Sequence, residues 1–462
     1  MKKKTIYIFC LAGVLCLSVF SACRKFVQIP PSPGTITTDQ LFADSVDAIA
    51  ALTGIYVNVF HGPNSMNAGS GFMTLYPGMT ADEMKPPFPG SDQEFSGNAI
   101  TPTNQGIESI WSSCYSFIYQ ANACIEGVAA SKVLSPSLKA RVTGEAKFFR
   151  AFFHLNLTNV FGGVPLIQTT DYNVNAKLGR TAKQDVYQAI IDDLLSSDSL
   201  LKNSSLPNIA SRINHFSVEA LLARMYLYEG DWQKAQAYAD QVINSGGYIL
   251  PHALDSVFLN GSTEGILQIP TTYPGDETTE ANYFLPFPGT NSAPNYLLDD
   301  YLLNAFEPGD LRKSAWTDSL SDGTTTWYYP YKYQLRNDYS SSAPPGEAYV
   351  WLRLSELYLI RAEAQAEQGN TGAALADIDL LRSRAGLAPS TAVSEADVLK
   401  AIQHERQVEL FAEWGHRWID LRRTGTMNAI LGAEKSGWTA SDTLFPIPYH
   451  EIQTNPFITP NP

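Results

Sequence analysis

The sequence predicts a mainly α-helical protein in which paired helices form a scaffold and long aromatic-rich loops are inserted between them. Three observations carry this prediction. Apolar residues recur with helical spacing over much of the 462-residue chain. Two segments repeat one helix–glycine–helix pattern. Between them, residues 247–350 break the helical rhythm and are rich in Pro, Gly, Thr, Asn and Tyr.

Four helices are expected before the repeated pattern. Helical spacing of apolar residues appears in the segments 45–60, 105–128, 137–161 and 181–201. The third helix should stop at Phe161, because Gly162 and Pro165 follow it and this order is typical of a helix end. Residues 61–103 contain the run Pro-Pro-Phe-Pro-Gly and are expected to be rich in loops.

The repeated pattern consists of two helix pairs, at 216–229 with 232–243 and at 354–368 with 373–384. A shift of 139 positions superposes Ala223 on Ala362, Gly230 on Gly369, Asp231 on Asn370 and Ala235 on Ala374. Small Ala side chains allow close helix packing, Gly ends the first helix, and Asp or Asn caps the second. The pattern resembles a tetratricopeptide unit, so we expect a tetratricopeptide-like scaffold. A last helix is expected over 395–414, followed by Arg417–Arg423 and a Pro-punctuated tail.

The charge balance argues against a nucleic-acid partner. The chain has 32 basic and 46 acidic residues and a net charge of −14. Non-specific binding to a polyanion requires Lys and Arg to displace counterions, so an acidic chain is poorly suited to it. We therefore expect no nucleic acid among the partners.

The N-terminus has the organisation of an export signal. Three lysines follow Met1, an apolar run extends from Ile6 to Phe20, and Ser21-Ala22 precede Cys23. A Cys directly after small residues resembles a bacterial lipobox, which predicts a lipoprotein signal peptide at 1–22, lipidation of Cys23 and a tether at 23–34. The alternative is an ordinary cleaved signal with an incidental Cys. If Cys114 and Cys124 share one helix, they are too far apart for a disulfide and should be free.

Four motifs together resemble one known family. They are GEAKFFRAFFH (144–154) with FGGVPL (161–166), WLRLSELYLIRAEA (351–364), ERQVEL (405–410) with GHRWIDLRR (415–423), and PIPYHEIQTNP (446–456). In order and spacing, they resemble the SusD-like (RagB/SusD) family over the whole mature chain. The resemblance implies a SusD-like helical region at 35–246 and a second one at 247–462, with the insertion 247–350 inside the latter.

The resemblance also implies a function. Such proteins are lipid-anchored at the outer membrane of Bacteroidota, which implies display on the exterior face, and bind a nutrient that is most often a glycan. They act as a lid on a SusC-like, TonB-dependent barrel transporter and are not enzymes. We therefore expect non-enzymatic capture of an oligosaccharide and its delivery to such a transporter, with no cofactor and no metal site. The tetratricopeptide-like face is the expected scaffold or partner surface.

The charged motif near the C-terminus is open to two interpretations. Glu405, Glu409 and Glu413 fall on one helix face, and two close carboxylates can serve as acid and base in glycoside hydrolysis. Several Arg side chains in the same stretch favour a structural ion-pair network instead. The resemblance agrees, since it makes the following residues a structural family motif: Glu405, Arg406, Glu409, Arg417, Asp420 and Arg422.

Aromatic loops are the better ligand-site candidates, because flat aromatic faces stack on the apolar faces of sugars and nearby polar groups bond the hydroxyls. The candidates for ligand contact are Tyr76, Phe88, Asn98, Tyr283, Trp327, Tyr328, Tyr329 and Tyr331. Alternation over 327–333 also fits a strand whose inward aromatics are core. The remaining aromatics with helical spacing are expected in the core: Trp111, Trp232, Trp351, Trp414 and Trp418.

Three rival functions remain at the level of sequence. The chain could bind a peptide or another non-glycan nutrient for the same kind of transporter. It could be a hydrolase that uses the carboxylates of 405–420, or a tetratricopeptide adaptor that binds no nutrient. Calorimetry against a glycan panel tests the first rival, and an assay for released reducing sugar tests the second. The third predicts that no ligand binds.

Overall fold

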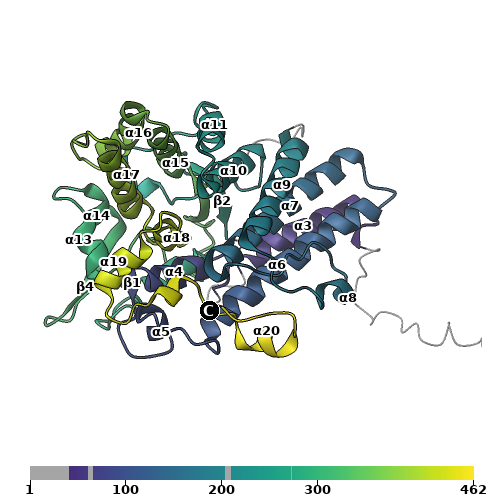
Figure 1. Ribbon diagram of the computed structural model, residues 1–462, viewed down its shortest axis with the longest axis horizontal. Helices are drawn as coiled ribbons and strands as arrows, with labels where there is room; N and C mark the ends of the chain where they lie inside the picture. Colours follow the sequence, from purple (N-terminus) through teal and green to yellow (C-terminus); the bar gives the residue numbers. More distant parts are fainter. Residues whose placement is uncertain (1–40, 61–65, 203–209, 272, 462) are drawn as a thin grey trace, which may run out of the picture.

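The computed structural model describes residues 41–461 apart from 61–65, 203–209 and 272. The predicted signal 1–22, the lipidation site Cys23 and the tether 23–34 lie outside the described residues. The chain is mainly helical, as predicted, and its strands are short (Figure 1). Among the described residues, no helix has both the length and the apolar content needed to cross a bilayer.

The helices of the first part of the chain confirm the four predicted segments. They and the short elements between them are α3 (Ser45–Asn58), α4 (Phe72–Thr80), β1 (Met84–Lys85), α5 (Gln93–Ser96), α6 (Gln105–Ala130), α7 (Pro136–Phe161), α8 (Tyr172–Asn175) and α9 (Lys183–Lys202). Helix α7 packs against α3, α6 and α9. It begins where the Ser135 side chain accepts from the Leu138 amide, and it ends at Gly162, whose φ is +77°. The predicted stop at Phe161 is confirmed.

The prediction that 61–103 is rich in loops misses a buried helix. Helix α4 contains Pro77 and Gly78, two residues that normally interrupt a helix, and nearly all its side chains are buried. The chain can pass close to this helix because Gly415 has no side chain. A Cβ at Gly415 would lie 2.7 Å from Pro77 Cβ and 2.8 Å from Met73 O, and its φ is +67°.

The two helix pairs form a stack at the top of Figure 1. They are α10 (His215–Glu229) with α11 (Trp232–Ile243) and α15 (Leu354–Glu367) with α16 (Thr371–Arg384), and α17 (Glu395–Leu410) packs on the second pair. The four repeated Ala side chains are fully buried, and the repeated glycines, Gly230 and Gly369, have φ of +73° and +80°. The tetratricopeptide-like arrangement is therefore consistent with the structure. The Asp231 side chain caps α11, whereas the Asn370 side chain makes no capping bond.

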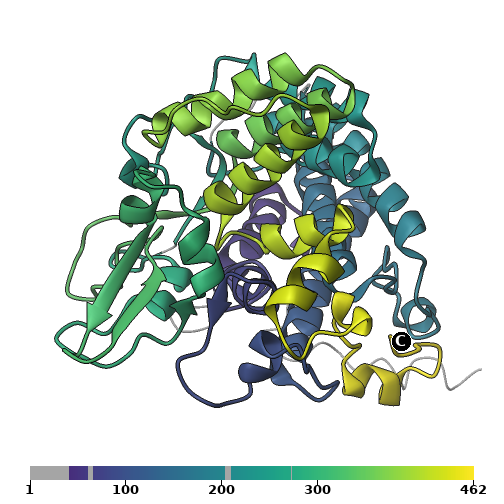
Figure 2. The same ribbon diagram turned by 60° about the vertical axis from the view of Figure 1, so that its left-hand side comes forward.

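Residues 247–350 are not a single loop, which corrects the predicted insertion. They contain η1 (Leu254–Ser256), β2 (Gly265–Pro270), α12 (Thr279–Phe284), β3 (Leu297–Leu298), α13 (Asp300–Ala305), α14 (Leu311–Trp316), β4 (Thr317–Ser321), β5 (Thr326–Pro330) and the start of β6 (Ala348–Arg353). Strand β2 pairs with β6, β1 with β3, and β4 with β5, each pair antiparallel. The β4–β5 hairpin projects at the left of Figure 2. These elements are too short to produce a clear periodic signal.

The C-terminal part contains α18 (His416–Arg423), α19 (Met427–Glu434), η2 (Ala440–Thr443) and α20 (Tyr449–Thr454). The predicted helix over 395–414 is shorter in the structure, since α17 ends at Leu410. Ala412 and Trp414 have positive φ, so the chain turns sharply between α17 and α18. This turn aims the Glu413 carboxylate at Arg353, whose Nε lies 2.8 Å away.

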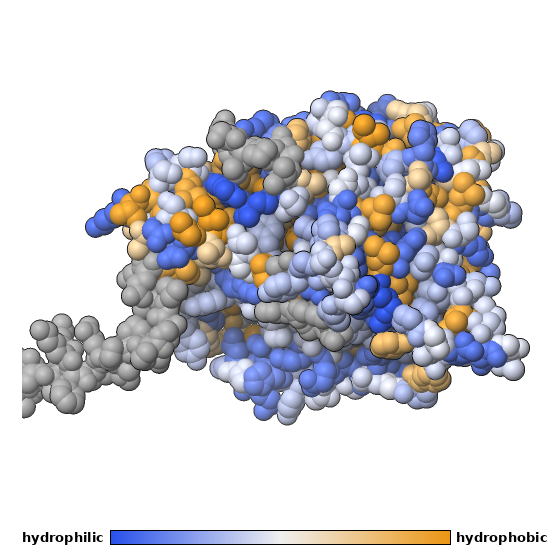
Figure 3. All heavy atoms as spheres, turned by 180° about the vertical axis from the view of Figure 1, so that it is seen from behind, coloured by the Kyte–Doolittle hydropathy of each residue, from blue (hydrophilic) through white to orange (hydrophobic). Residues whose placement is uncertain are grey.

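An aromatic core joins the two halves of the chain. Phe152 of α7 stacks on Trp351 of β6 with ring centroids 4.3 Å apart, and Trp414 packs edge-on against both. Of the five tryptophans assigned to the core, four are buried and Trp232 is half-buried. The division into 35–246 and 247–462 stays a prediction. On the face seen in Figure 3, hydrophobic side chains lie scattered among hydrophilic ones.

Candidate functional site

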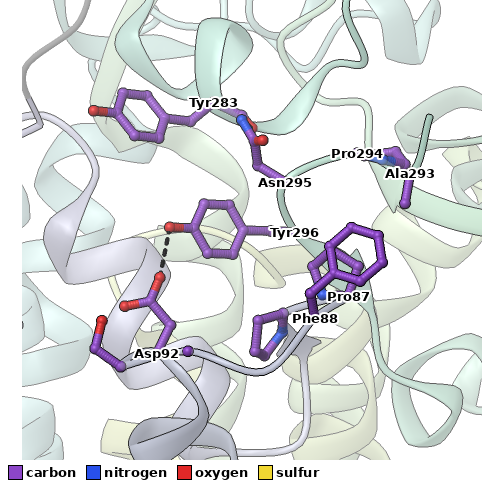
Figure 4. A pocket seen from close by; sticks show the side chains of 11 residues that line it. Pro87, Phe88, Asp92, Tyr283, Ala293, Pro294, Asn295 and Tyr296 are labelled. Carbon is purple, nitrogen blue, oxygen red and sulfur yellow. Dashed lines mark hydrogen bonds between the residues drawn. The ribbon is translucent and has the colours of Figure 1, made fainter. Parts of the chain in front are cut away.

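A pocket forms where two segments far apart in the sequence are brought together by a short sheet. Met84 pairs with Leu298 and Lys85 with Leu297, which joins β1 to β3. The pairing places residues 86–92, which follow β1, beside residues 283–296, which precede β3. Between them lies a cavity of about 300 Å³ (Figure 4). The pairing of two residues on each strand therefore holds the two segments that line the pocket next to each other.

The walls of the pocket are aromatic and prolyl. Phe88 is 65% exposed at the rim, Tyr283 is half-buried, and Tyr296 is 9% exposed. In Figure 4 the Tyr283 and Tyr296 rings come from one side of the pocket and Phe88 from the other. Pro86, Pro87 and Pro294 complete the apolar lining. The prolines restrict the backbone on both sides, so the aromatic rings are presented from stiff segments.

Polar groups stand at the edge of these rings. The Tyr296 hydroxyl donates to Asp92 Oδ2 at 2.9 Å, and Asn295 Nδ2 donates to the Tyr283 carbonyl at 3.2 Å. Burial, reinforced by the Asp92 carboxylate, raises the pKa of Tyr296. The phenol therefore stays protonated and keeps Asp92 in place as a hydrogen-bond acceptor beside the cavity.

Tyr76 supports the pocket from behind. It lies on α4, is 9% exposed, and stacks on Phe95 with ring centroids 4.3 Å apart. Burial is the main cause that raises its pKa, and the charge of Asp92 adds to it. The stack joins α4 to α5, the short helix that Asp92 precedes.

The structure brings together only some of the residues proposed from sequence. Phe88 and Tyr283 line the pocket, and Tyr76 packs behind it. Asn98 lies apart: its backbone has φ of +53° and its buried amide donates to the Thr80 carbonyl at 3.0 Å. That geometry gives Asn98 a role in the turn after α5.

The other candidates lie on and after β5. The strand interpretation of this segment describes its backbone correctly, since Thr326–Pro330 pairs with β4. Tyr329 points inward and donates to Asp318 Oδ2 at 2.7 Å, whereas Tyr328 is 42% exposed and Trp327 is half-buried. Tyr331 lines a different cavity of about 480 Å³ together with His252 and Gln334. None of these four belongs to the pocket between β1 and β3.

Among the pocket residues that sequence reasoning missed, three make the hydrogen bonds described above: Asp92, Asn295 and Tyr296. The run Pro294-Asn295-Tyr296 has the composition expected of a sugar site, a tyrosine beside an amide. Its partner Asp92 is 204 positions away, and no local signal connects the two. The β1–β3 pairing supplies that connection.

The charged motif is a buried ion-pair network. Glu409 contacts Arg312, Arg353 and Arg384, and Glu405 contacts Arg312. Both carboxylates are fully buried. Although burial alone would raise it, the three guanidinium groups hold the pKa of Glu409 well below its usual value. A carboxylate held ionised and enclosed by arginines is unsuited to acid–base catalysis on a sugar.

The other motif residues also have structural partners. Arg406 Nε lies 2.7 Å from Asp420 Oδ2, Arg417 Nε lies 2.8 Å from Asp82 Oδ1, and Arg422 Nη1 donates to the Asn159 carbonyl at 2.8 Å. Asp82 belongs to the segment after α4, and Asn159 belongs to α7. The motif therefore ties the C-terminal helices to elements from the first half of the chain.

A further hollow of about 750 Å³ lies between the first helix pair and the C-terminal helices. It is lined by apolar, polar and charged side chains, among them Trp232, Glu363, His404 and Arg423. The acid and the guanidinium are already engaged, since Arg423 Nη2 donates to Glu363 Oε2 at 2.7 Å.

Comparison with known proteins identifies the family. A family model described as "SusD family" matches residues 287–462, and a model described as "Starch-binding associating with outer membrane" matches residues 38–227. The SusD-like protein P38 of Formosa agariphila is 23% identical over 97% of this chain and 97% of its own length. The chain belongs to the SusD-like family. A SusD-like protein of Bacteroides ovatus is 24% identical over 87% of this chain and 80% of its own length.

Solved structures of SusD-like proteins share the fold. A SusD superfamily protein from Bacteroides vulgatus superposes with a TM-score of 0.76 at 21% identity, covering 91% of this chain and 99% of its own. A structure described as a laminarin-binding SusD-like protein superposes with a TM-score of 0.73 at 25% identity, covering 90% and 99% of the two chains. The SusD-like helical fold predicted from the four motifs is confirmed.

Proposed function

We propose that this SusD-like protein captures an oligosaccharide in the pocket formed by Phe88, Tyr283 and Tyr296, without breaking a bond in it. The observation that carries the proposal is the combination of aromatic faces with a polar edge in one concave site. Ligand sites are commonly concave, largely apolar, and equipped with a few placed polar groups.

The chemistry of a sugar matches this pocket. The C–H faces of a pyranose ring are apolar and pack on aromatic rings, while its hydroxyls require donors and acceptors at the ring edge. Asp92 offers a carboxylate acceptor, and Asn295 offers an amide oxygen, since its Nδ2 already donates to the Tyr283 carbonyl. Phe88 is largely exposed at the rim, so the pocket can hold part of a longer chain and leave the rest in solvent.

The relatives support a glycan as the ligand class. One superposable structure is of a laminarin-binding protein, and the family model for the first half of the chain is described by starch binding. That same description associates the family with the outer membrane. We extend this to the chain: lipidation at Cys23 anchors it on the outer face of that membrane, and it delivers the sugar to a SusC-like, TonB-dependent transporter. The stacked helix pairs supply the scaffold or the docking face for that partner.

Titration calorimetry against a panel of glycans and peptides tests this function. Laminarin oligosaccharides, starch oligosaccharides and a peptide mixture form the panel. A heat of binding with at least one glycan and none with peptides is expected. Binding of peptides alone would establish the non-glycan alternative and reject the proposal.

Pocket variants locate the binding site. Tyr283→Ala or Phe88→Ala should cost about 1–2 kcal/mol of binding free energy, which is the usual range for an aromatic contact residue, and weaken affinity roughly 5- to 30-fold. Tyr172→Ala is the matched control, because Tyr172 is 79% exposed on α8, away from the pocket. Equal affinity of all three variants would place the ligand elsewhere. Reducing sugar released by the purified protein would reject the non-enzymatic part of the proposal.

A further inference from the structure

Three metal-ligating side chains converge at the junction of α9 and α10. Asp198 lies in the last turns of α9, and His215 and Glu219 lie one turn apart at the start of α10. One ligand atom from each, a carboxylate oxygen or an imidazole nitrogen, lies within 4.8 Å of the other two. The two helices pack side by side (Figure 1), so both backbones hold the cluster.

One polar atom of each side chain in this cluster lacks a hydrogen-bond partner among the described residues, although His215 Nδ1 lies 3.8 Å from Glu219 Oε1. Within the described part of the chain, Asp198 Oδ1, His215 Nδ1 and Glu219 Oε2 are buried and have no hydrogen-bond partner. Glu219 is only 1% exposed. Buried polar groups are normally hydrogen-bonded, because leaving one unsatisfied destabilises the folded protein. Three such atoms at one point, within the described residues, make the cluster a candidate site for a bound ion.

The local charges call for a cation. Asp198 and Glu219 bring two carboxylates close together at this point, beside the His215 imidazole. Lys202 is the cation that approaches, with Nζ 3.4 Å from Glu219 Oε1. Its side chain is 54% exposed, and it contacts Oε1 of Glu219, the oxygen other than the unpartnered Oε2. It therefore leaves the three unpartnered atoms unsatisfied and can turn away into solvent.

The ligand types select among cations. A His and a Glu four residues apart on a helix face the same side, as in many metal sites. Imidazole is a poor ligand for Ca²⁺ and Mg²⁺, which prefer oxygen, and a good ligand for Zn²⁺ and similar ions. Zn²⁺ takes His and carboxylate ligands at about 2.0–2.2 Å, which sets ligand atoms roughly 3.3–3.5 Å apart in a tetrahedron. Small rotations of the three side chains would bring them to that spacing.

We propose that Asp198, His215 and Glu219 bind one divalent transition-metal ion of the Zn²⁺ type, with water as a further ligand. The ion clamps the end of α9 to the start of α10, where the N-terminal helices lead into the first helix pair. It is a structural site, and it is separate from the sugar pocket. It does not depend on the proposed sugar binding.

Direct metal titration of the mature protein tests the site. After treatment with chelator and its removal, calorimetry with Zn²⁺ should show one tight site, and the thermal midpoint should rise with Zn²⁺ concentration because the ion binds the folded chain. Co²⁺ in place of Zn²⁺ should give visible d–d absorption typical of a four-coordinate site. Absence of a tight site in the wild-type protein overturns the proposal.

Three variants assign the ligands. His215→Asn and Glu219→Gln should each weaken Zn²⁺ binding by more than roughly 100-fold, beyond the loss seen when an outer-shell partner is removed. Asp198→Asn controls for misfolding. It removes a like-charge repulsion, so the thermal midpoint of the metal-free protein should stay unchanged or rise. The rise of that midpoint with Zn²⁺ concentration should be lost. His450→Asn, at an exposed histidine in α20, is the control and should bind Zn²⁺ like the wild type. Unchanged Zn²⁺ affinity in all three cluster variants would place the ion elsewhere and refute the assignment.

Discussion

A buried ion pair joins the two tetratricopeptide-like helix pairs, and its removal should destabilise the protein strongly. Arg224 of α10 reaches Glu356 of α15 through two hydrogen bonds, Nε to Oε1 and Nη2 to Oε2, both 2.6 Å long. The side chains are 5% and 2% exposed. The substitution Arg224→Met keeps most of the side-chain length but leaves the Glu356 carboxylate buried and unpaired.

The expected cost follows from that geometry. Breaking a buried ion pair by removing one partner costs about 3–5 kcal/mol, because the remaining charge has neither water nor a counter-ion. The double variant Arg224→Met with Glu356→Met removes both charges and should recover most of that loss, since an apolar pair in the same space is often nearly neutral. The recovery distinguishes an uncompensated charge from simple loss of packing.

Guanidinium unfolding followed by circular dichroism measures the effect. The control is Lys234→Met, because Lys234 forms an exposed ion pair with Asp231 on the same helix pair, at 2.8 Å and 57% exposed. Its loss should not shift the midpoint measurably. The reasoning is refuted if Arg224→Met shifts the midpoint no more than Lys234→Met, or if the double variant is as unstable as the single one.

Three further predictions concern the backbone, the pH response and the thiols. Gly369→Ala should destabilise the protein by about 1 kcal/mol in the same unfolding assay, because its φ of +80° disfavours a side chain although the surrounding space is open. Gly372→Ala, in the first turn of α16, with open space around it and no positive φ, should be neutral or stabilising, and equal losses at both sites would contradict this account. Burial raises the pKa of Glu280 from 4.5 to about 8 in the folded chain. Between these two pH values the folded chain binds a proton that the unfolded chain has released, so the free energy of unfolding falls as the pH rises. Glu280→Gln should make that fall shallower between pH 5 and pH 8, and an unchanged slope of the thermal midpoint against pH would be inconsistent with it. Cys114 and Cys124 are buried free thiols, and burial raises the pKa of both. A thiol reagent should therefore label neither in the native protein and both after unfolding. Rapid labelling of either thiol in the native protein would contradict this expectation.

The long helices could be predicted from sequence because their signals are local. In α7 the start at Ser135-Pro136, the dense Phe pattern and the stop at Gly162 all occur within the helix or beside it. The repeated Ala and Gly positions of the helix pairs are likewise readable in sequence, since they reflect contacts between neighbours in the chain. Helix α4 could not be predicted in this way: Pro77 and Gly78 oppose a helix locally, and burial against Gly415 holds it in place.

The candidate site was predictable only in its chemistry. Aromatic residues in Pro-rich segments indicated Phe88 and Tyr283, but they equally indicated Tyr329, whose hydroxyl is bonded to Asp318 inside a hairpin. What separates them is the pairing of β1 with β3, two residues on each strand, which joins segments far apart in the sequence. The ion-pair network shows the same limit, because Arg312 and Arg353 come from outside the motif that contains Glu409. Contacts of this range leave no periodic trace in one sequence.

A crystal structure of the mature protein with a bound oligosaccharide tests the central claim most directly. The ligand is chosen as the glycan that gives the largest heat in the calorimetric panel. We predict a sugar ring in van der Waals contact with Phe88, Tyr283 or Tyr296, with a hydroxyl bonded to Asp92 or Asn295. A sugar bound instead against the β4–β5 hairpin, or in the hollow between α10 and α17, with the Phe88 pocket left to solvent, would contradict the account.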